Sequence, residues 1–109
     1  TNRCCISGLS DPRLLVASHI VPWRDDEENR LNPHNGLALS MLHDKAFDIG
    51  LITVDEKLRV VVSEQDWPDD DEFAQQALVN CHGQPLNQPE KFMPQQAFLE
   101  HHRENIFLG

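Results

Sequence analysis

The chain has 109 residues, which is the length of one compact domain and too short for two. Its 39% hydrophobic and 25% charged residues are ordinary for a globular protein, and no apolar run approaches the roughly 20 residues of a membrane-spanning helix. The net charge of −9 predicts long-range repulsion of nucleic acid, so a nucleic-acid substrate would require attraction from a bound metal ion or another domain.

The first part of the chain predicts a β-hairpin with a long connection. Residues 14–21 are apolar and β-branched, which predicts a buried strand, and Pro22 ends it. The polar segment 24–33 predicts a loop. The short apolar run 36–39 predicts a second strand that pairs with the first.

A helix and a second hairpin are expected next. Ser40 is a good N-cap for a helix over 41–49, and Gly50 is a good residue to end it. The runs 51–54 and 58–63 are rich in β-branched residues and flank a short charged turn, which predicts another hairpin.

The last part predicts two further helices. Asp69–Asp71 can cap a helix that runs to about residue 80 and is ended by Gly83. A final helix is expected over about 95–107. The predicted fold class is therefore α+β, with strand, loop, strand and helix at its centre.

Several side chains able to carry chemistry fall in this central part. His19 ends the first strand, Asn35 precedes the second, and the helix carries His43, Asp44 and Asp48. A lone histidine in such a place is more often structural, so the interest lies in the combination.

Helical geometry separates the three helix residues. Asp44 and Asp48 are four residues apart, about 40° around the axis, so both can face one ion, and oxygen ligands suit Mg²⁺ or Mn²⁺ better than zinc. His43 and Asp48 are about 140° apart, and His43 lies on the side of Phe47, an expected core residue. A solvated helix face beside Lys45 is the alternative interpretation of the two carboxylates.

The chain resembles the HNH nuclease family, restriction-type McrA-like branch, in four stretches: RCCISGL at 3–9, ASHIVPW at 17–23, NRLNPHNGLALSMLHDKAFDIGLIT at 29–53 and LEHHRENIF at 99–107. The resemblance implies a ββα-metal core with an additional β-hairpin and C-terminal helices. It implies His19 as the general base and Asn35 as the residue that braces the loop and orients that base. It implies a divalent ion, Mg²⁺ or Mn²⁺ and possibly Ni²⁺, held by Asp44 and Asp48.

The sequence departs from the family pattern at three points. Ser18 stands where many members have a metal ligand just before the base, and the zinc-binding CxxC pair of many members is lacking. The helix has His43-Asp44 where a single histidine is usual, so His43 stays open as an alternative ligand, with Asp44 favoured by its spacing.

The remaining expectations concern substrate and setting. Arg30, with Arg24 and Arg103, is a candidate for phosphate contacts because a guanidinium matches phosphate oxygens. We expect double-stranded DNA as the substrate, no membrane, a possible homodimer and a linked recognition domain. The alternatives are an inactive HNH-fold module that binds metal or DNA, and an RNase or nonspecific toxin nuclease.

Cysteine usage and the first residue bear on location and extent. The odd set Cys4, Cys5 and Cys81 is no disulfide framework, which favours a reducing, cytoplasmic compartment. Without CxxC pairs, no structural zinc is expected. Residue 1 is not Met, so residues 1–109 are expected to be a single domain excised from a longer protein.

Overall fold

A computed structural model describes residues 3–22, 25–29, 31–65, 67–87 and 93–109. Its centre is a two-stranded antiparallel sheet of β1, Leu15–His19, and β2, Gly36–Ser40. The register runs from Leu15 opposite Ser40 to His19 opposite Gly36. The helix α1, Met41–Asp48, follows β2 without a connection, so strand, loop, strand and helix occur in the predicted order.

The boundaries of α1 follow from its caps. The Ser40 side chain accepts a hydrogen bond from the His43 backbone N–H, which satisfies one of the unpaired donors of the first turn. Gly50 has a φ of 85°, and a Cβ placed there would lie 2.1 Å from the Ile106 carbonyl oxygen. Glycine is therefore required where the chain leaves α1 and packs against the C-terminal segment.

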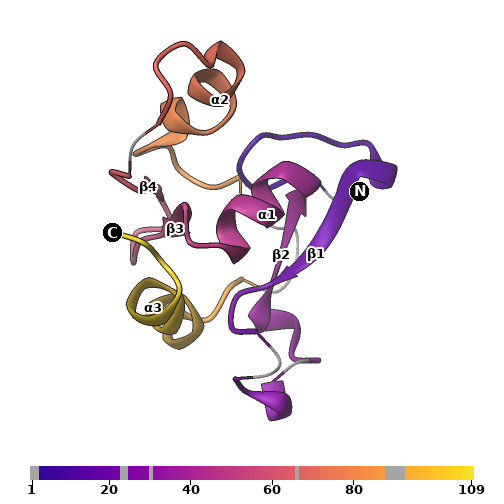
Figure 1. The fold of residues 1–109 in the computed structure, drawn as a ribbon. Helices are drawn as coiled ribbons and strands as arrows, with labels where there is room; N and C mark the ends of the chain where they lie inside the picture. Colours follow the sequence, from indigo (N-terminus) through magenta and orange to yellow (C-terminus); the bar gives the residue numbers. More distant parts are fainter. Residues whose placement is uncertain (1–2, 23–24, 30, 66, 88–92) are drawn as a thin grey trace.

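The remaining elements surround this core. A second hairpin pairs β3, Ile52–Val54, with β4, Val60–Val62, and the helices α2 and α3 span Glu72–Ala77 and Gln96–Asn105. Single 3₁₀ turns lie at Pro12–Leu14, Glu27–Asn29, Pro33–Asn35 and Val79–Cys81. In Figure 1, α1 lies between the two hairpins, with α2 on one side and α3 on the opposite side.

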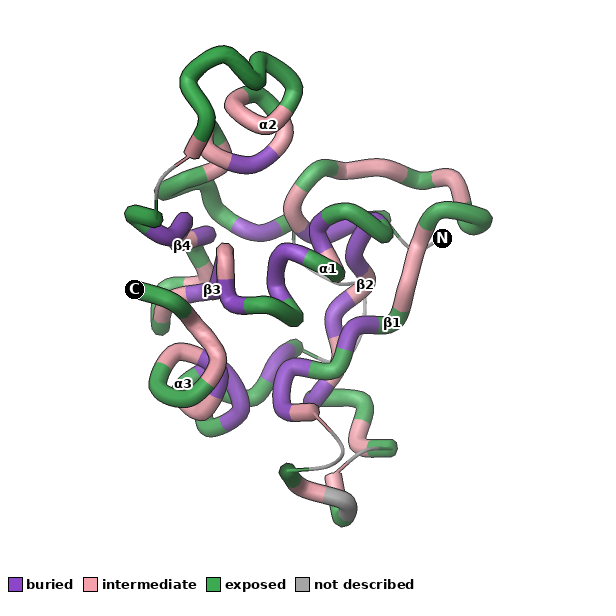
Figure 2. Tube along the Cα trace, in the orientation of Figure 1, coloured by how far each residue is buried: buried purple, intermediate pink, exposed green. Residues whose placement is uncertain are grey.

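The core lies where α1, the strands and α3 meet. Its fully buried residues include Leu39, Phe47, Ile52 and Leu99, one from each of β2, α1, β3 and α3. The helix α2 contributes no buried residue, and Figure 2 shows it as a mixture of exposed and intermediate residues. The part of the fold that holds α1 against the first hairpin is therefore the best packed.

Several predicted elements are shorter in the structure: the strand predicted over 58–63 spans Val60–Val62, and the helix predicted over 95–107 spans Gln96–Asn105. The predicted strand 14–21 ends at His19, because the N–H groups of Ile20 and Val21 bond instead to the backbone and side-chain oxygens of Asn35. The predicted helix to residue 80 ends at Ala77 and continues as a 3₁₀ turn. Within the described residues, no helix is long and apolar enough to cross a membrane.

Candidate active site

His19 is the last residue of β1 and is exposed to solvent. It lies opposite Gly36, whereas the preceding Ser18 lies opposite Leu37 and is buried with it. Because side chains alternate along a strand, Ser18 faces the core that α1 also covers, and His19 faces outward. The position that many family members use for a metal ligand thus points toward the helix side of the hairpin.

Asn35 closes the loop that follows His19. It is fully buried, its Oδ1 accepts a hydrogen bond from the Val21 N–H at 2.8 Å, and its Nδ2 donates to the Val21 carbonyl at 3.1 Å. The Ile20 N–H also donates to the Asn35 carbonyl at 3.0 Å, and Nδ2 lies 3.3 Å from the Asn29 carbonyl. These bonds fix the backbone immediately after His19.

The two carboxylates of α1 occupy different electrostatic positions. Asp44 lies in the first turn, where the helix dipole favours a negative charge, and Asp48 is the last residue of the helix, where the dipole disfavours it. Asp44 is half-buried and Asp48 is exposed. A stabilising interaction with the helix dipole therefore explains a carboxylate at position 44, but it does not explain one at position 48.

His43 is buried on the other side of α1, beside the core residue Phe47 as predicted. Its Nε2 donates to the Ala77 carbonyl at 2.8 Å, and its Nδ1 lies 2.6 Å from the Ser40 hydroxyl. Burial lowers its pKa, but hydrogen bonds with Cys4 and the Ala77 carbonyl raise it more, so the pKa lies above its usual value. Both ring nitrogens are thus used within the fold.

The donor set fits a hard divalent cation that keeps water or phosphate ligands. Mg²⁺ is usually bound through one or two carboxylates together with waters and substrate phosphates, which is what Asp44 and Asp48 can offer. Among the described residues, no three His, Cys, Asp or Glu side chains lie close enough to hold one ion. The described cysteines are free, so they provide no zinc cluster either.

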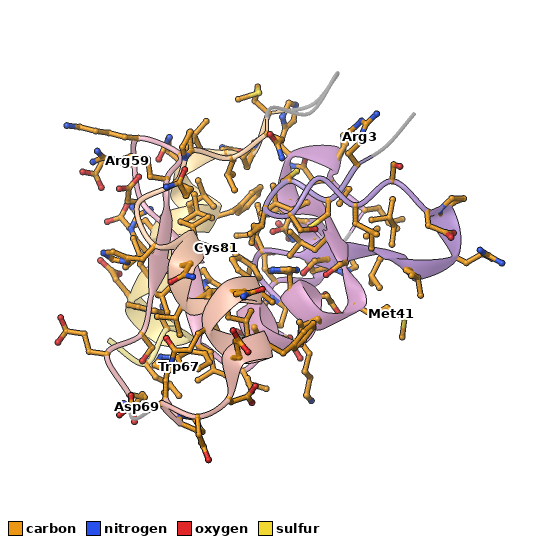
Figure 3. The ribbon with its side chains drawn as sticks, turned by 90° about the horizontal axis from the view of Figure 1, so that it is seen from above. Arg3, Met41, Arg59, Trp67, Asp69 and Cys81 are labelled. Atoms are coloured by element: carbon orange, nitrogen blue, oxygen red, sulfur yellow. The ribbon has the colours of Figure 1, made fainter. Side chains whose placement is uncertain are left out.

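A groove of about 520 Å³ lies beside the first turn of α1, and neither Asp44 nor Asp48 lines it. Its apolar lining includes Leu9, Leu14, Leu42 and Phe73, and His43 is the sole candidate site residue among the lining residues. Met41, which also lines it, points outward from the ribbon in Figure 3. An apolar groove without the carboxylates or His19 does not suit phosphodiester chemistry.

The candidate phosphate ligands are placed unequally. Arg24 and Arg30 lie outside the described residues. Arg103 is half-buried and donates from Nη1 to the Val54 carbonyl at 2.9 Å, so it joins α3 to β3. Arg103 therefore has a structural role in addition to any contact with phosphate.

The histidine pair of α3, His101 and His102, has defined contacts in the structure. His101 Nε2 lies 3.4 Å from Asp25 Oδ2, in the loop that follows His19. His102 Nε2 donates to the carbonyl of Phe47, the residue before Asp48. The pair stands in the LEHHRENIF stretch that supported the family resemblance, which was the available signal for a role at the site.

Comparison with known proteins bears on the family and the fold. The sequence profile described as HNH endonuclease matches residues 4–55, which contain His19, Asn35, Asp44 and Asp48. No curated protein matches the chain. The fold is similar to that of a solved structure, "Modification dependent TagI restriction endonuclease", with a TM-score of 0.64 and 18% sequence identity over 95% of this chain and 33% of that chain.

The chain thus spans about a third of the length of that enzyme, in which the shared fold is one part of a longer protein. The predicted family and fold class are both confirmed by these matches. Residues 4–55 thus match the HNH endonuclease family, and the fold built around them is similar to that of a solved restriction endonuclease.

Proposed function

We propose that this chain hydrolyses phosphodiester bonds of double-stranded DNA, with His19 as the general base. The observation that carries the proposal is the exposed His19 at the end of β1, with the backbone after it braced by Asn35, in the same matched stretch as the two carboxylates of α1. Each is a residue type that metal-assisted hydrolysis requires. The family match covers all four residues.

The residues divide the work as follows. Neutral His19 takes a proton from water as the water oxygen attacks the phosphorus, and the bond from phosphorus to the 3′ oxygen breaks. Asn35 holds the backbone after His19, so the imidazole keeps its direction toward that water. Asp44 and Asp48 would hold Mg²⁺ or Mn²⁺, with Ni²⁺ a further candidate, and a bound ion supplies charge stabilisation to the phosphate. We favour these carboxylates over His43, whose ring nitrogens are both engaged.

The setting is proposed on the same grounds. Because the chain has a net charge of −9 and spans 33% of its structural relative, we propose that a linked domain brings the DNA and selects the sequence. A dimer would allow both strands to be cut. The free Cys4, Cys5 and Cys81 support a reducing, cytoplasmic location.

The test is cleavage of supercoiled plasmid in Mg²⁺ or Mn²⁺, with EDTA as the blank. General-base action is worth roughly 10²–10⁴-fold, so a folded His19→Ala protein is expected to lose cleavage by at least about a hundredfold. Asp70→Asn, which removes an exposed acid near α2, is the matched control and should cleave normally. Full activity in the His19→Ala protein would refute the assignment of the base.

An inactive module is the second candidate, and Ser18 at the usual ligand position favours it. It predicts that the chain binds Mn²⁺, measured by calorimetry, yet nicks no plasmid with any divalent ion, either alone or within the longer protein. An RNA substrate assayed beside the plasmid distinguishes the DNA nuclease and the inactive module from an RNase, which would cleave the RNA.

A further inference from the structure

The loop between His19 and β2 is held in place chiefly by hydrogen bonds. Of its described residues, Asp25, Glu28, Leu31 and His34 are exposed, and Leu31 is 86% exposed. Burial therefore does little to fix the part of the loop that lies away from Asn35 and its hydrogen-bond partners. Its position relative to the rest of the site depends on polar contacts with neighbouring elements.

The C-terminal segment supplies those contacts. The His34 Nδ1 donates to the Met93 carbonyl at 2.7 Å, and the Gln95 N–H donates to the His34 carbonyl at 3.1 Å. Nearer the start of the loop, His101 of α3 approaches Asp25, with 3.4 Å between His101 Nε2 and Asp25 Oδ2. The loop is thus attached to residues 93–101 at two separate places.

Asn105 sets the hydrogen-bonding direction of His101. Its Nδ2 lies 3.3 Å from His101 Nδ1 and also donates to the His101 carbonyl at 3.0 Å. Because an amide N–H only donates, Nδ1 accepts and Nε2 carries the proton that Asp25 receives as a hydrogen bond.

The next residue of α3 anchors the helix to α1. His102 is 1% exposed, stacks on the Phe47 ring with 3.7 Å between ring centroids, and donates to the Phe47 carbonyl at 2.8 Å. Its Nδ1 accepts from the Thr53 hydroxyl at 2.7 Å. Phe47 immediately precedes Asp48, so His102 holds the end of α1 that carries this carboxylate.

We propose that His101 is a positioning residue of the nuclease site. Successive residues of α3 point about 100° apart, so His102 reaches α1 while His101 reaches the loop that follows His19. The helix thereby sets the separation between the proposed base and the proposed metal ligands. This inference rests on the proposed function, and it assigns part of the site to residues outside the 4–55 match.

The test compares His101→Ala, His101→Gln, Asp25→Ala and the Asp25→Ala/His101→Ala double variant in plasmid nicking. Because misplacement by about 1 Å can cost up to about 10²-fold in rate, His101→Ala should lower kcat roughly tenfold with KM unchanged. His101→Gln should restore most of the loss, since its amide can donate to Asp25. The double variant should be no slower than either single variant.

The melting temperature separates positioning from general stability. A solvent-exposed contact contributes little to stability, so Tm should stay within a few degrees in all four variants. Unchanged kcat in His101→Ala, or a loss that follows Tm and is not rescued by Gln, would overturn the proposal.

Hydrogen exchange of the amides of residues 25–34 gives a readout that needs no activity. Faster exchange in His101→Ala than in the wild type is expected. If the wild type cleaves nothing, either alone or within the longer protein, the proposed function fails, and the exchange result decides separately whether His101 holds the loop. Unchanged exchange would show that the contact of His101 with Asp25 does not hold the loop.

Discussion

At the scale of single residues, Asp48 is the candidate site residue that is worst placed for stability. It ends α1, where the helix dipole disfavours a carboxylate, and it lies one turn after Asp44, whose like charge repels it. Within the described part of the chain, no basic side chain forms an ion pair with Asp48 that would offset this cost. A side chain that costs stability where a cation would make it favourable is a reasonable sign of function.

Replacing Asp48 with Asn should therefore stabilise the metal-free protein. The expected gain is about 0.3–1 kcal/mol, measured by urea unfolding at pH 7 in EDTA. Asp44→Asn is the matched control: it relieves the same repulsion but removes a favourable interaction with the helix N-terminus, so its gain should be smaller or negative. Added Mn²⁺ should then stabilise the wild type and not the Asp48→Asn protein. A destabilised Asp48→Asn protein in EDTA would contradict this account.

At the scale of elements, α3 is attached to the fold through a buried neutral histidine. Burial lowers the pKa of His102 to about 4, whereas an unfolded chain leaves histidine near its ordinary value of 6.5. As pH falls from 6.5 toward 4, the unfolded state takes up a proton that the folded state resists. The folded state therefore loses stability through this window, and below pH 4 the loss from His102 stops growing.

The size of this effect can be measured. The shift corresponds to about 3 kcal/mol at most, so urea unfolding of the wild type should weaken by up to that amount between pH 6.5 and 4. His102→Gln should lack this component. His43 has a raised pKa and acts in the opposite sense, giving stability at low pH that is lost as pH rises. A nitrogen-15 NMR titration showing His102 protonated at pH 6 would refute the prediction without any variant.

Elements with local signals were predictable from the sequence. The cap at Ser40 and the glycine at position 50 fix α1 within one residue of its expected end, because both act on the adjacent backbone. The apolar run 14–21 predicted a strand, but neither its length nor its burial: Leu14 and Ala17 are exposed, and Asn35, 14 residues after Val21, takes over the hydrogen bonds at the end of the run. Local pattern gives the existence of an element more readily than its last residue or its burial.

The same limit explains which site residues were foreseen. Helical spacing put His43 on the buried side of α1, as observed, and the prediction that Asp44 and Asp48 face one ion stays a prediction. The partners of His43 and His101 could not be foreseen, because Ala77 and Asp25 lie 34 and 76 residues away in sequence. Their contacts depend on the packing of α2 and α3, which no periodicity encodes.

At the scale of the whole molecule, the charge of −9 limits how the chain meets DNA. Binding of isolated chain to a short duplex should depend weakly on salt. The three arginine candidates give a slope of log K against log salt no steeper than about −3, at about −0.9 for each phosphate contacted. Fluorescence anisotropy over 50–200 mM salt measures this slope; a value near −6 would show that further basic residues bind DNA.

The attachment of the loop to α3 also bears on protein engineering. A designer who wanted a small cleavage module would be tempted to transplant residues 4–55 alone, because that stretch contains every proposed catalytic group. Such a graft would leave behind His101, His102 and the Met93 carbonyl, and with them the contacts between the base-bearing loop and the rest of the fold. We therefore expect the smallest portable unit of the proposed site to be a discontinuous pairing of residues 4–55 with the helix at the far end of the chain.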